Sequence, residues 1–182
     1  MDRKRLIMGL IVIIAIPLYV WIAYYEIPGK ARIGEEKLQQ DPMKHDFEKV
    51  LEFESNYMGD ASNTSALFQL LPLNEYKGSI EMDPDRFSLV VHYQASIAEL
   101  GEKAEQAFLY NTTAAFLMLK NLEVVELRFL DDSYIVHREN VEEWFGEEFG
   151  TLIEPDVFKE KVQKPLGEPG IDEWLKAYMK EE

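Results

Sequence analysis

The chain has no cysteine among its 182 residues. It can therefore form no disulfide, and it has neither a thiol nucleophile nor the cysteine that lipoprotein processing modifies. A domain that stands in an oxidising compartment without cysteine has to be held together by its packing alone. The stretch between Leu38 and Leu152 is long enough for one hydrophobic core, so one globular domain is expected.

Motifs that mark catalytic and phosphate-binding sites are missing as well. The sequence contains no G-x-S-x-G, no H-E-x-x-H and no glycine-rich phosphate loop, and its acidic pairs lack calcium-loop spacing. The three histidines, His45, His92 and His137, are far apart. We therefore predict no catalytic, cofactor-binding or metal-binding residue and no cofactor. The alternative is a surface metal or anion site in which His92 and His137 share an open sheet face near Arg86 and Arg128.

Basic residues are scarce, with 19 Lys and Arg against 34 Asp and Glu, which gives a formal net charge of −15. Such a surface repels nucleic acid and anionic lipid headgroups, so neither is an expected ligand. We interpret the acidity as a source of solubility or as an adaptation to salty or alkaline surroundings. The alternative is that it attracts cations or a basic partner.

Charge is entirely absent from residues 6–25. Twenty helical residues span roughly 30 Å, the thickness of the hydrocarbon core, so we predict a single transmembrane helix here. Residues 3–5 are all basic and should stay in the cytoplasm, which places everything after Tyr25 outside. The end of the predicted span carries the aromatic side chains typical of a membrane interface: Tyr19, Trp21, Tyr24 and Tyr25.

A cleaved signal peptide is the competing interpretation of the same segment. The apolar run from Leu6 to Ile16 ends at Pro17 and fits the apolar region of such a peptide. Cleavage after Ala23, however, would put Trp21 at a position that needs a small residue. An uncleaved anchor is favoured, and both interpretations place the remaining chain outside the cytoplasm.

The chain divides by composition into five segments. We predict a cytoplasmic tail (1–5), a transmembrane helix (6–25), a polar stalk (26–40), an extracytoplasmic α+β domain (41–152), and a C-terminal linker with an amphipathic helix (153–182). Apolar residues at helical spacing, including Trp174 and Tyr178, favour docking of this last helix on the domain over binding to a partner helix.

Periodicity in the domain predicts two hairpins on either side of a long helix. Helices are expected from Asp41 to about residue 54 and at 61–70, 99–120, 138–145 and 172–179, and strands at 77–82, 86–94, 124–130 and 134–137. The order α-α-β-β-α-β-β-α predicts an α+β fold. In it, a mostly antiparallel four-stranded sheet packs with the central helix 99–120 and flanking helices.

Several single residues have predicted structural roles. Gly59 suits a backbone position with positive φ, Asp60 suits the N-cap of the next helix, and Pro72 ends that helix. Asn111 falls inside the alanine stripe of the central helix, so its amide should be buried. A buried amide needs hydrogen-bond partners, which we expect to be backbone groups of the Tyr57–Asp60 turn.

Short motifs in a fixed order carry a resemblance to a known family. The motifs are Tyr57-Met58-Gly59-Asp60, Leu71-Pro72-Leu73, residues 110–116 (YNTTAAF), Arg138-Glu139 and Trp144-Phe145-Gly146. Over residues of about 50–150 the chain resembles the domain-of-unknown-function family 4825. The resemblance implies a bacterial, membrane-anchored, extracytoplasmic domain with no assigned activity. It marks as motif residues Tyr57, Gly59, Asp60, Pro72, Asn111, Arg138, Trp144 and Gly146.

Together these features predict an interaction or sensing module of the bacterial cell envelope rather than an enzyme. Its expected partners are the lipid bilayer, through residues 6–25, and an unidentified envelope or membrane protein. Two alternatives stay open: a metal-dependent envelope enzyme that uses His92 and His137, and a purely structural envelope accessory.

Overall fold

The chain forms two compact units, Met1–Leu38 and Gln39–Glu182. The computed structural model describes residue 3 and residues 14–180. In the first unit residues 14–21 are helical, and the helix continues through η1 (Ile22–Glu26) into α2 (Ile27–Gln39). The predicted stalk is therefore helical.

The predicted transmembrane helix lies only partly within the described residues, because residues 6–13 are outside them. In the part that is described, Ile14, Ile16 and Leu18 are each more than half exposed. Among the residues that the structure places, no helix is both long enough and apolar enough to cross a membrane. The span 6–25 stays a prediction.

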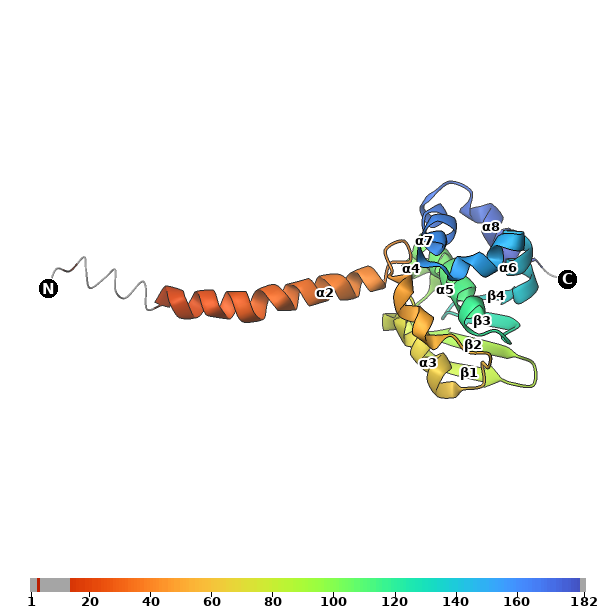
Figure 1. Ribbon diagram of the computed structural model, residues 1–182, viewed down its shortest axis with the longest axis horizontal. Helices are drawn as coiled ribbons and strands as arrows, with labels where there is room; N and C mark the ends of the chain where they lie inside the picture. Colours follow the sequence, from red (N-terminus) through yellow and green to blue (C-terminus); the bar gives the residue numbers. More distant parts are fainter. Residues whose placement is uncertain (1–2, 4–13, 181–182) are drawn as a thin grey trace. The chain divides into compact units, whose positions relative to one another are not determined.

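The second unit contains the α+β fold in the predicted order of elements (Figure 1). Its first half consists of η2 (Phe47–Phe53), α3 (Ala61–Leu70), η3 (Asn74–Tyr76), β1 (Lys77–Asp83) and β2 (Ser88–Tyr93). Its middle consists of α4 (Ile97–Leu100), α5 (Glu102–Met118), β3 (Val124–Arg128), β4 (Ser133–His137) and α6 (Arg138–Phe145). Short helices follow: η4 (Gly146–Ile153), α7 (Pro155–Phe158), η5 (Lys159–Gln163), η6 (Pro165–Gly167) and α8 (Ile171–Tyr178).

Two predicted helices differ from the structure. The first does not start at Asp41, whose carboxylate instead closes a tight turn by accepting the backbone N–H of Met43 at 3.0 Å. A 3₁₀ helix then begins at Phe47. The predicted helix 99–120 is divided at Gly101, which has φ +57°, a value that glycine adopts without steric cost.

The sheet has the order β1-β2-β3-β4 and is mixed rather than purely antiparallel. The hairpins β1–β2 and β3–β4 are antiparallel, as predicted, but the central strands β2 and β3 run parallel. A parallel pair needs a crossover connection of about a dozen residues or more, usually helical, and α4 and α5 provide it here. The turn residues predict each hairpin, whereas the crossover decides how the hairpins join.

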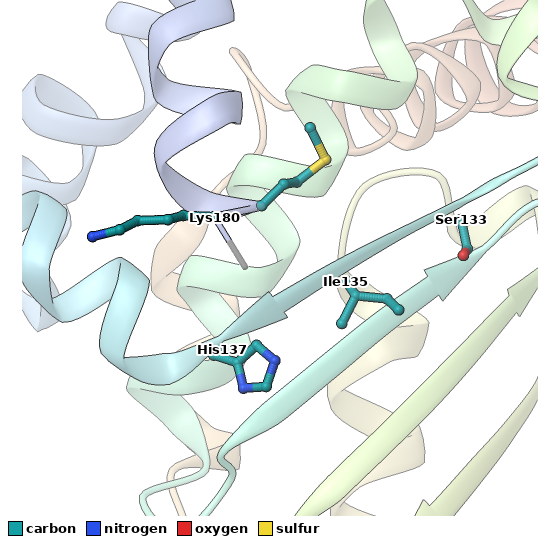
Figure 2. A pocket seen from close by; sticks show the side chains of 5 residues that line it. Ser133, Ile135, His137 and Lys180 are labelled. Carbon is teal, nitrogen blue, oxygen red and sulfur yellow. The ribbon is translucent and has the colours of Figure 1, made fainter. Parts of the chain in front are cut away.

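One face of the sheet is covered and the other is open. On β2, Leu89, Val91 and Tyr93 are buried, while the alternate residues are only partly covered. On β4, Val136 is buried, and Ser133, Ile135 and His137 lie on the open side of the strand (Figure 2). This alternation follows from the period of two in a strand.

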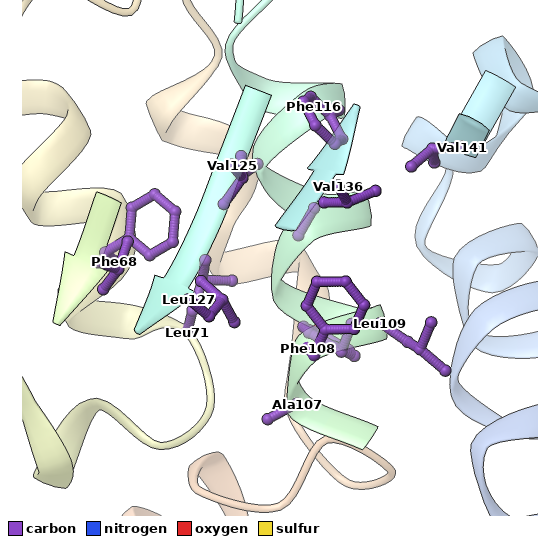
Figure 3. Close-up of a cluster of buried hydrophobic side chains, with 14 of the residues drawn as sticks. Phe68, Leu71, Ala107, Phe108, Leu109, Phe116, Val125, Leu127, Val136 and Val141 are labelled. Atoms are coloured by element: carbon purple, nitrogen blue, oxygen red, sulfur yellow. The ribbon is translucent and has the colours of Figure 1, made fainter. Parts of the chain in front are cut away.

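Helix α5 forms the centre of the core. Every residue from Gln106 to Met118 is buried, so the helix needs neighbours all round and not on one stripe alone. Figure 3 shows Phe108 and Phe116 of this helix among side chains of β3 and β4, such as Val125 and Val136.

Residues beyond Leu152 provide the cover on the other side of α5. Phe158, Val162 and Leu166 belong to the same buried cluster, as do Trp174 and Tyr178 of α8. Residues 153–180 are thus part of the compact unit. The predicted docking of the last helix on the domain is confirmed, whereas the segment before it is not a separate linker. The proline and glycine content of 164–170 suggested a linker, but short helices with single buried side chains also have this composition.

Candidate functional site

The Tyr57-Met58-Gly59-Asp60 motif is attached to the carboxyl end of α5. Just before it, the N–H of Ser55 donates to the carbonyl of Met118 at 2.7 Å, and the N–H of Lys120 donates to the carbonyl of Ser55 at 2.9 Å. Within it, the N–H of Met58 donates to Oδ1 of Asn121 at 2.6 Å. The first of these bonds satisfies a carbonyl that the end of the helix leaves free, and the other two fix the segment beside it.

Arg138 binds the same end of α5 from another direction. Its Nε donates to the carbonyl of Leu122 at 2.7 Å, and its Nη2 donates to the carbonyls of Phe116 at 2.9 Å and Leu119 at 2.7 Å. The guanidinium carbon also lies 5.2 Å from the Phe116 ring centroid. With 11% of its side chain exposed, Arg138 neutralises the negative end of the helix dipole and caps its carbonyls.

Asp60 and Gly59 shape the turn that enters α3. Asp60 is the predicted N-cap, since its side chain accepts from the N–H groups of Ser62 at 3.0 Å and Asn63 at 3.1 Å. Gly59 is not among the residues with positive φ, so that prediction is wrong. A Cβ at Gly59 would lie 2.8 Å from Cε1 of Tyr57, so a side chain there would displace this exposed ring.

The polar segment 110–113 of α5 connects three distant parts of the chain. The Tyr110 hydroxyl lies 2.6 Å from Nδ1 of His45, and the Thr113 hydroxyl lies 2.6 Å from that of Tyr178 in α8. Asn111 lies between these two contacts along the helix. Because α5 is buried on all sides, each polar side chain in it must find a partner in a different neighbour.

Asn111 is buried, as predicted, but its partners are not those predicted. Its Nδ2 donates to the carbonyl of Pro72 at 2.9 Å and to the Tyr93 hydroxyl at 3.3 Å, and its Oδ1 has no partner among the described residues. The Tyr57–Asp60 turn lies at the other end of α5, where Asn121 binds it instead. Burial raises the pKa of the Tyr93 hydroxyl, which therefore stays protonated.

No pattern in the sequence indicates that His45 is a buried polar residue. Its Nε2 lies 2.9 Å from the carbonyl of Leu70, which can only accept, so we assign the proton to Nε2 and a bond from the Tyr110 hydroxyl to Nδ1. Burial lowers the pKa of His45 to about 4. The helical spacing expected around Asp41 hid this role, because it placed His45 on an amphipathic helix.

Trp144 and Gly146 occupy the end of α6. Gly146 has φ +56° and ends the helix, as predicted. Trp144 is 43% exposed and stacks on the buried Trp174 with ring centroids 5.8 Å apart. The family motif at this position thus joins α6 to α8.

The structure does not bring His92 and His137 together. His92 pairs with Arg128, and Arg128 with Ser133, while His137 is four residues further along β4. With strand spacings of about 4.8 Å and a rise of about 3.3 Å per residue, the two Cα atoms are roughly 16 Å apart. His92 instead lies 2.8 Å from Oε1 of Glu81.

These two histidines therefore cannot share one metal ion, whose bonds to nitrogen are about 2 Å long. Within residues 14–180, no group of three or more His, Asp or Glu side chains could hold a metal ion.

A hollow of about 330 Å³ lies beside β4 and is lined by Ser133, Ile135, His137, Met179 and Lys180 (Figure 2). Ile135 is the most exposed of the three strand residues, at 46%. No motif marked this surface in the sequence. The one feature of the sequence that relates to this surface is that the strand Ser133–His137 contains no Lys, Arg, Asp or Glu.

Comparison with known proteins gives one match. No curated protein sequence and no solved structure is similar to the chain. Residues 50–139 match the family model described as Domain of unknown function (DUF4825). Six of the eight predicted motif residues fall within this range, and Trp144 and Gly146 follow it directly. This match confirms, over residues 50–139, the family resemblance that the sequence motifs indicated.

Proposed function

We propose that this chain is a single-pass, membrane-anchored interaction or sensing module whose domain stands outside the cytoplasm of a bacterial cell. The observation that supports a binding role most strongly is the open edge of the sheet, with its hollow beside Ile135. The polar groups singled out by the family motifs, Arg138, Asn111 and Asp60, all hold segments of the fold together. Of the eight motif residues, the aromatic Tyr57 and Trp144 are exposed, and the free edge of β4 lies outside the motifs.

The proposed location rests on the first 25 residues. The uncharged run 6–25 and the basic residues before it favour an anchor with its N-terminus in the cytoplasm. Ile14, Ile16 and Leu18, which belong to this run, expose more than half of their surface. Lipid is the environment in which such side chains are stable.

Single cysteines test the orientation cleanly, because the chain has none of its own. Asp85→Cys, in the exposed turn between β1 and β2, should react with a membrane-impermeant maleimide in intact cells. The matched variant Asp2→Cys should react only after lysis. Protection of Asp85→Cys until lysis would refute the proposed location.

Cross-linking in living cells tests the binding role. A photo-reactive amino acid at Ile135 should give a defined cross-linked product, and the same residue at Arg86, which is exposed in the β1–β2 turn, should give much less. Absence of any product from either position, in cells where the protein is present in the membrane, would contradict an interaction module.

A further inference from the structure

The two edges of the sheet differ in how they are protected. Edge strands usually carry charges, bulges or proline that prevent pairing with another chain. At the β1 edge the register shifts between Lys77 and Ile80, and the strand carries Lys77, Glu81 and Asp83. The β4 edge, Ser-Tyr-Ile-Val-His, pairs with β3 in unbroken register and has no Lys, Arg, Asp, Glu or Pro.

The backbone groups that point outward from β4 follow from its pairing with β3. The N–H of Arg138 donates to the carbonyl of Glu123, and the N–H of Phe129 donates to that of Asp132. In an antiparallel ladder such bonded positions alternate, so Asp132, Tyr134, Val136 and Arg138 face β3. Ser133, Ile135 and His137 therefore direct their backbone N–H and carbonyl groups to the free edge.

Two of these six outward groups already have partners. The N–H of Ser133 donates to Oδ1 of Asp132 at 2.8 Å. His137 is the N-cap of α6, and the carbonyl of an N-cap accepts the first bond of its helix. Four groups remain without a partner in the part of the chain that the structure describes. They are the carbonyl of Ser133, the N–H and carbonyl of Ile135, and the N–H of His137.

These four groups are complementary to themselves. If a second β4 lies antiparallel to the first, with the twofold axis at Ile135, each Ile135 N–H meets the other Ile135 carbonyl. Each His137 N–H then meets the Ser133 carbonyl of the other copy, and no group is left over. We propose that the β4 edge is a docking site for a second copy of this chain, which joins two sheets into one of eight strands.

The side chains on the open face fit this arrangement. The two Ile135 side chains would lie opposite each other, and apolar β-branched pairs of this kind stabilise antiparallel strands. Ser133 would face His137 of the second copy, which allows a hydrogen bond between hydroxyl and imidazole. The hollow beside Ile135 is lined on its other side by Met179 and Lys180 (Figure 2).

Charge opposes the pairing and gives it a recognisable salt dependence. Each copy has a formal net charge of −15, so two copies repel each other at low ionic strength. Salt screens exposed charges over about 10 Å at 0.1 M, and pairing should therefore strengthen as salt is added. Anchoring in one membrane would raise the local concentration of copies further. The inference rests here on the proposed function and deepens it by naming the partner.

Single cysteines in the full chain test the pairing and its register. Hydrogen-bonded antiparallel partners have Cα atoms about 5.5 Å apart, within the roughly 4.4–6.8 Å that a disulfide spans. Ile135→Cys should therefore form a disulfide dimer on mild oxidation, in membranes and in the purified full chain. Val90→Cys, on the open face of the inner strand β2, is the matched control and should not.

A mixture of two further variants fixes the register. Ser133→Cys or His137→Cys alone should stay monomeric, because equivalent residues would be roughly 13 Å apart. Mixed together they should form the heterodimer. Equal cross-linking of Ile135→Cys and Val90→Cys, or a Ser133→Cys homodimer, would overturn the proposed pairing. If Ile135→Cys joined a different protein instead of a second copy, self-pairing would be wrong and the binding role would stand.

Discussion

Backbone carbonyls at the carboxyl end of α5 have side-chain hydrogen-bond partners, whereas backbone groups at the free edge of β4 lack partners within residues 14–180. At the end of α5, carbonyls of Phe116, Leu119 and Leu122 all accept from Arg138. At the β4 edge, Ile135 has neither its N–H nor its carbonyl paired within residues 14–180. The first region is complete in one chain, whereas the second becomes complete only if another strand is added. The motif residue Arg138 thus holds the fold together, whereas the association that we propose uses the β4 edge, which lies outside the motifs.

The largest effect on the free energy of unfolding is expected from Arg138→Met, at the carboxyl end of α5. The substitution removes the donor of three carbonyls at the end of α5, so the free energy of unfolding should fall by roughly 3 kcal/mol. Urea denaturation of the purified protein measures it. Arg128→Met is the matched control, since Arg128 only pairs with Glu126 on the open face and should cost less than about 1 kcal/mol. Equal losses in the two variants would contradict the role of Arg138.

The next effect is expected from Asn111→Ala. It leaves the Pro72 carbonyl and the Tyr93 hydroxyl without their buried donor, and the free energy of unfolding should fall by about 1–3 kcal/mol. Thermal melting followed by circular dichroism gives the comparison. Asn74→Ala, which exchanges a half-buried amide bonded to Gln40, should have a much smaller effect. An unchanged melting temperature for Asn111→Ala would refute the assignment.

Acid should destabilise the packing around α5 through His45, which contacts Tyr110 of this helix. Its folded pKa of about 4 is below the unfolded value of about 6.5, so the unfolded chain binds the proton first as pH falls. Stability from this group is complete above pH 6.5 and should decrease by about 2 kcal/mol between pH 7 and pH 5. His45→Gln should reduce this pH dependence of the unfolding free energy, while His137→Gln should keep it. Identical slopes in all three proteins would contradict a neutral, buried His45.

The smallest effect on stability, and the largest on association, is expected from Ile135→Lys. Ile135 is 46% exposed, so the free energy of unfolding should change by less than about 0.5 kcal/mol. A lysine pair at the twofold axis would repel, and sedimentation of the full chain should show the loss of the dimer. Val90→Lys, on the same face but on an inner strand, should keep it. Loss of the dimer in both variants would contradict the claim that the dimer forms specifically through the β4 edge.

The sequence predicted the elements of this fold well where local signals decide them. Asp60 caps α3, Gly146 ends α6, and both hairpins form where their turn residues indicate. It predicted that the last helix docks on the domain, but not the parallel pair β2–β3 or the packing of residues 153–170 into the core. Both depend on how α5 is surrounded, which is a property of distant contacts and not of any local pattern.

Less of the candidate site than of the fold could be predicted from the sequence. Asn111 was correctly expected to be buried, yet its partners Pro72 and Tyr93 depend on which loop reaches the middle of α5. The free edge could not be identified either, because a strand's position in the sheet is set by pairing order. The observed order β1-β2-β3-β4 leaves the uncharged strand outside, and no local pattern indicates this order.

Amide hydrogen exchange of the full chain at rising protein concentration compares the two regions in one measurement. The amides of Ile135 and His137 should become more protected as concentration rises, because a second copy supplies their acceptors. Those of α5, which are already bonded within one chain, should keep the same protection. Exchange at Ile135 and His137 that is fast and independent of concentration would contradict a β4 edge that is completed by a second copy.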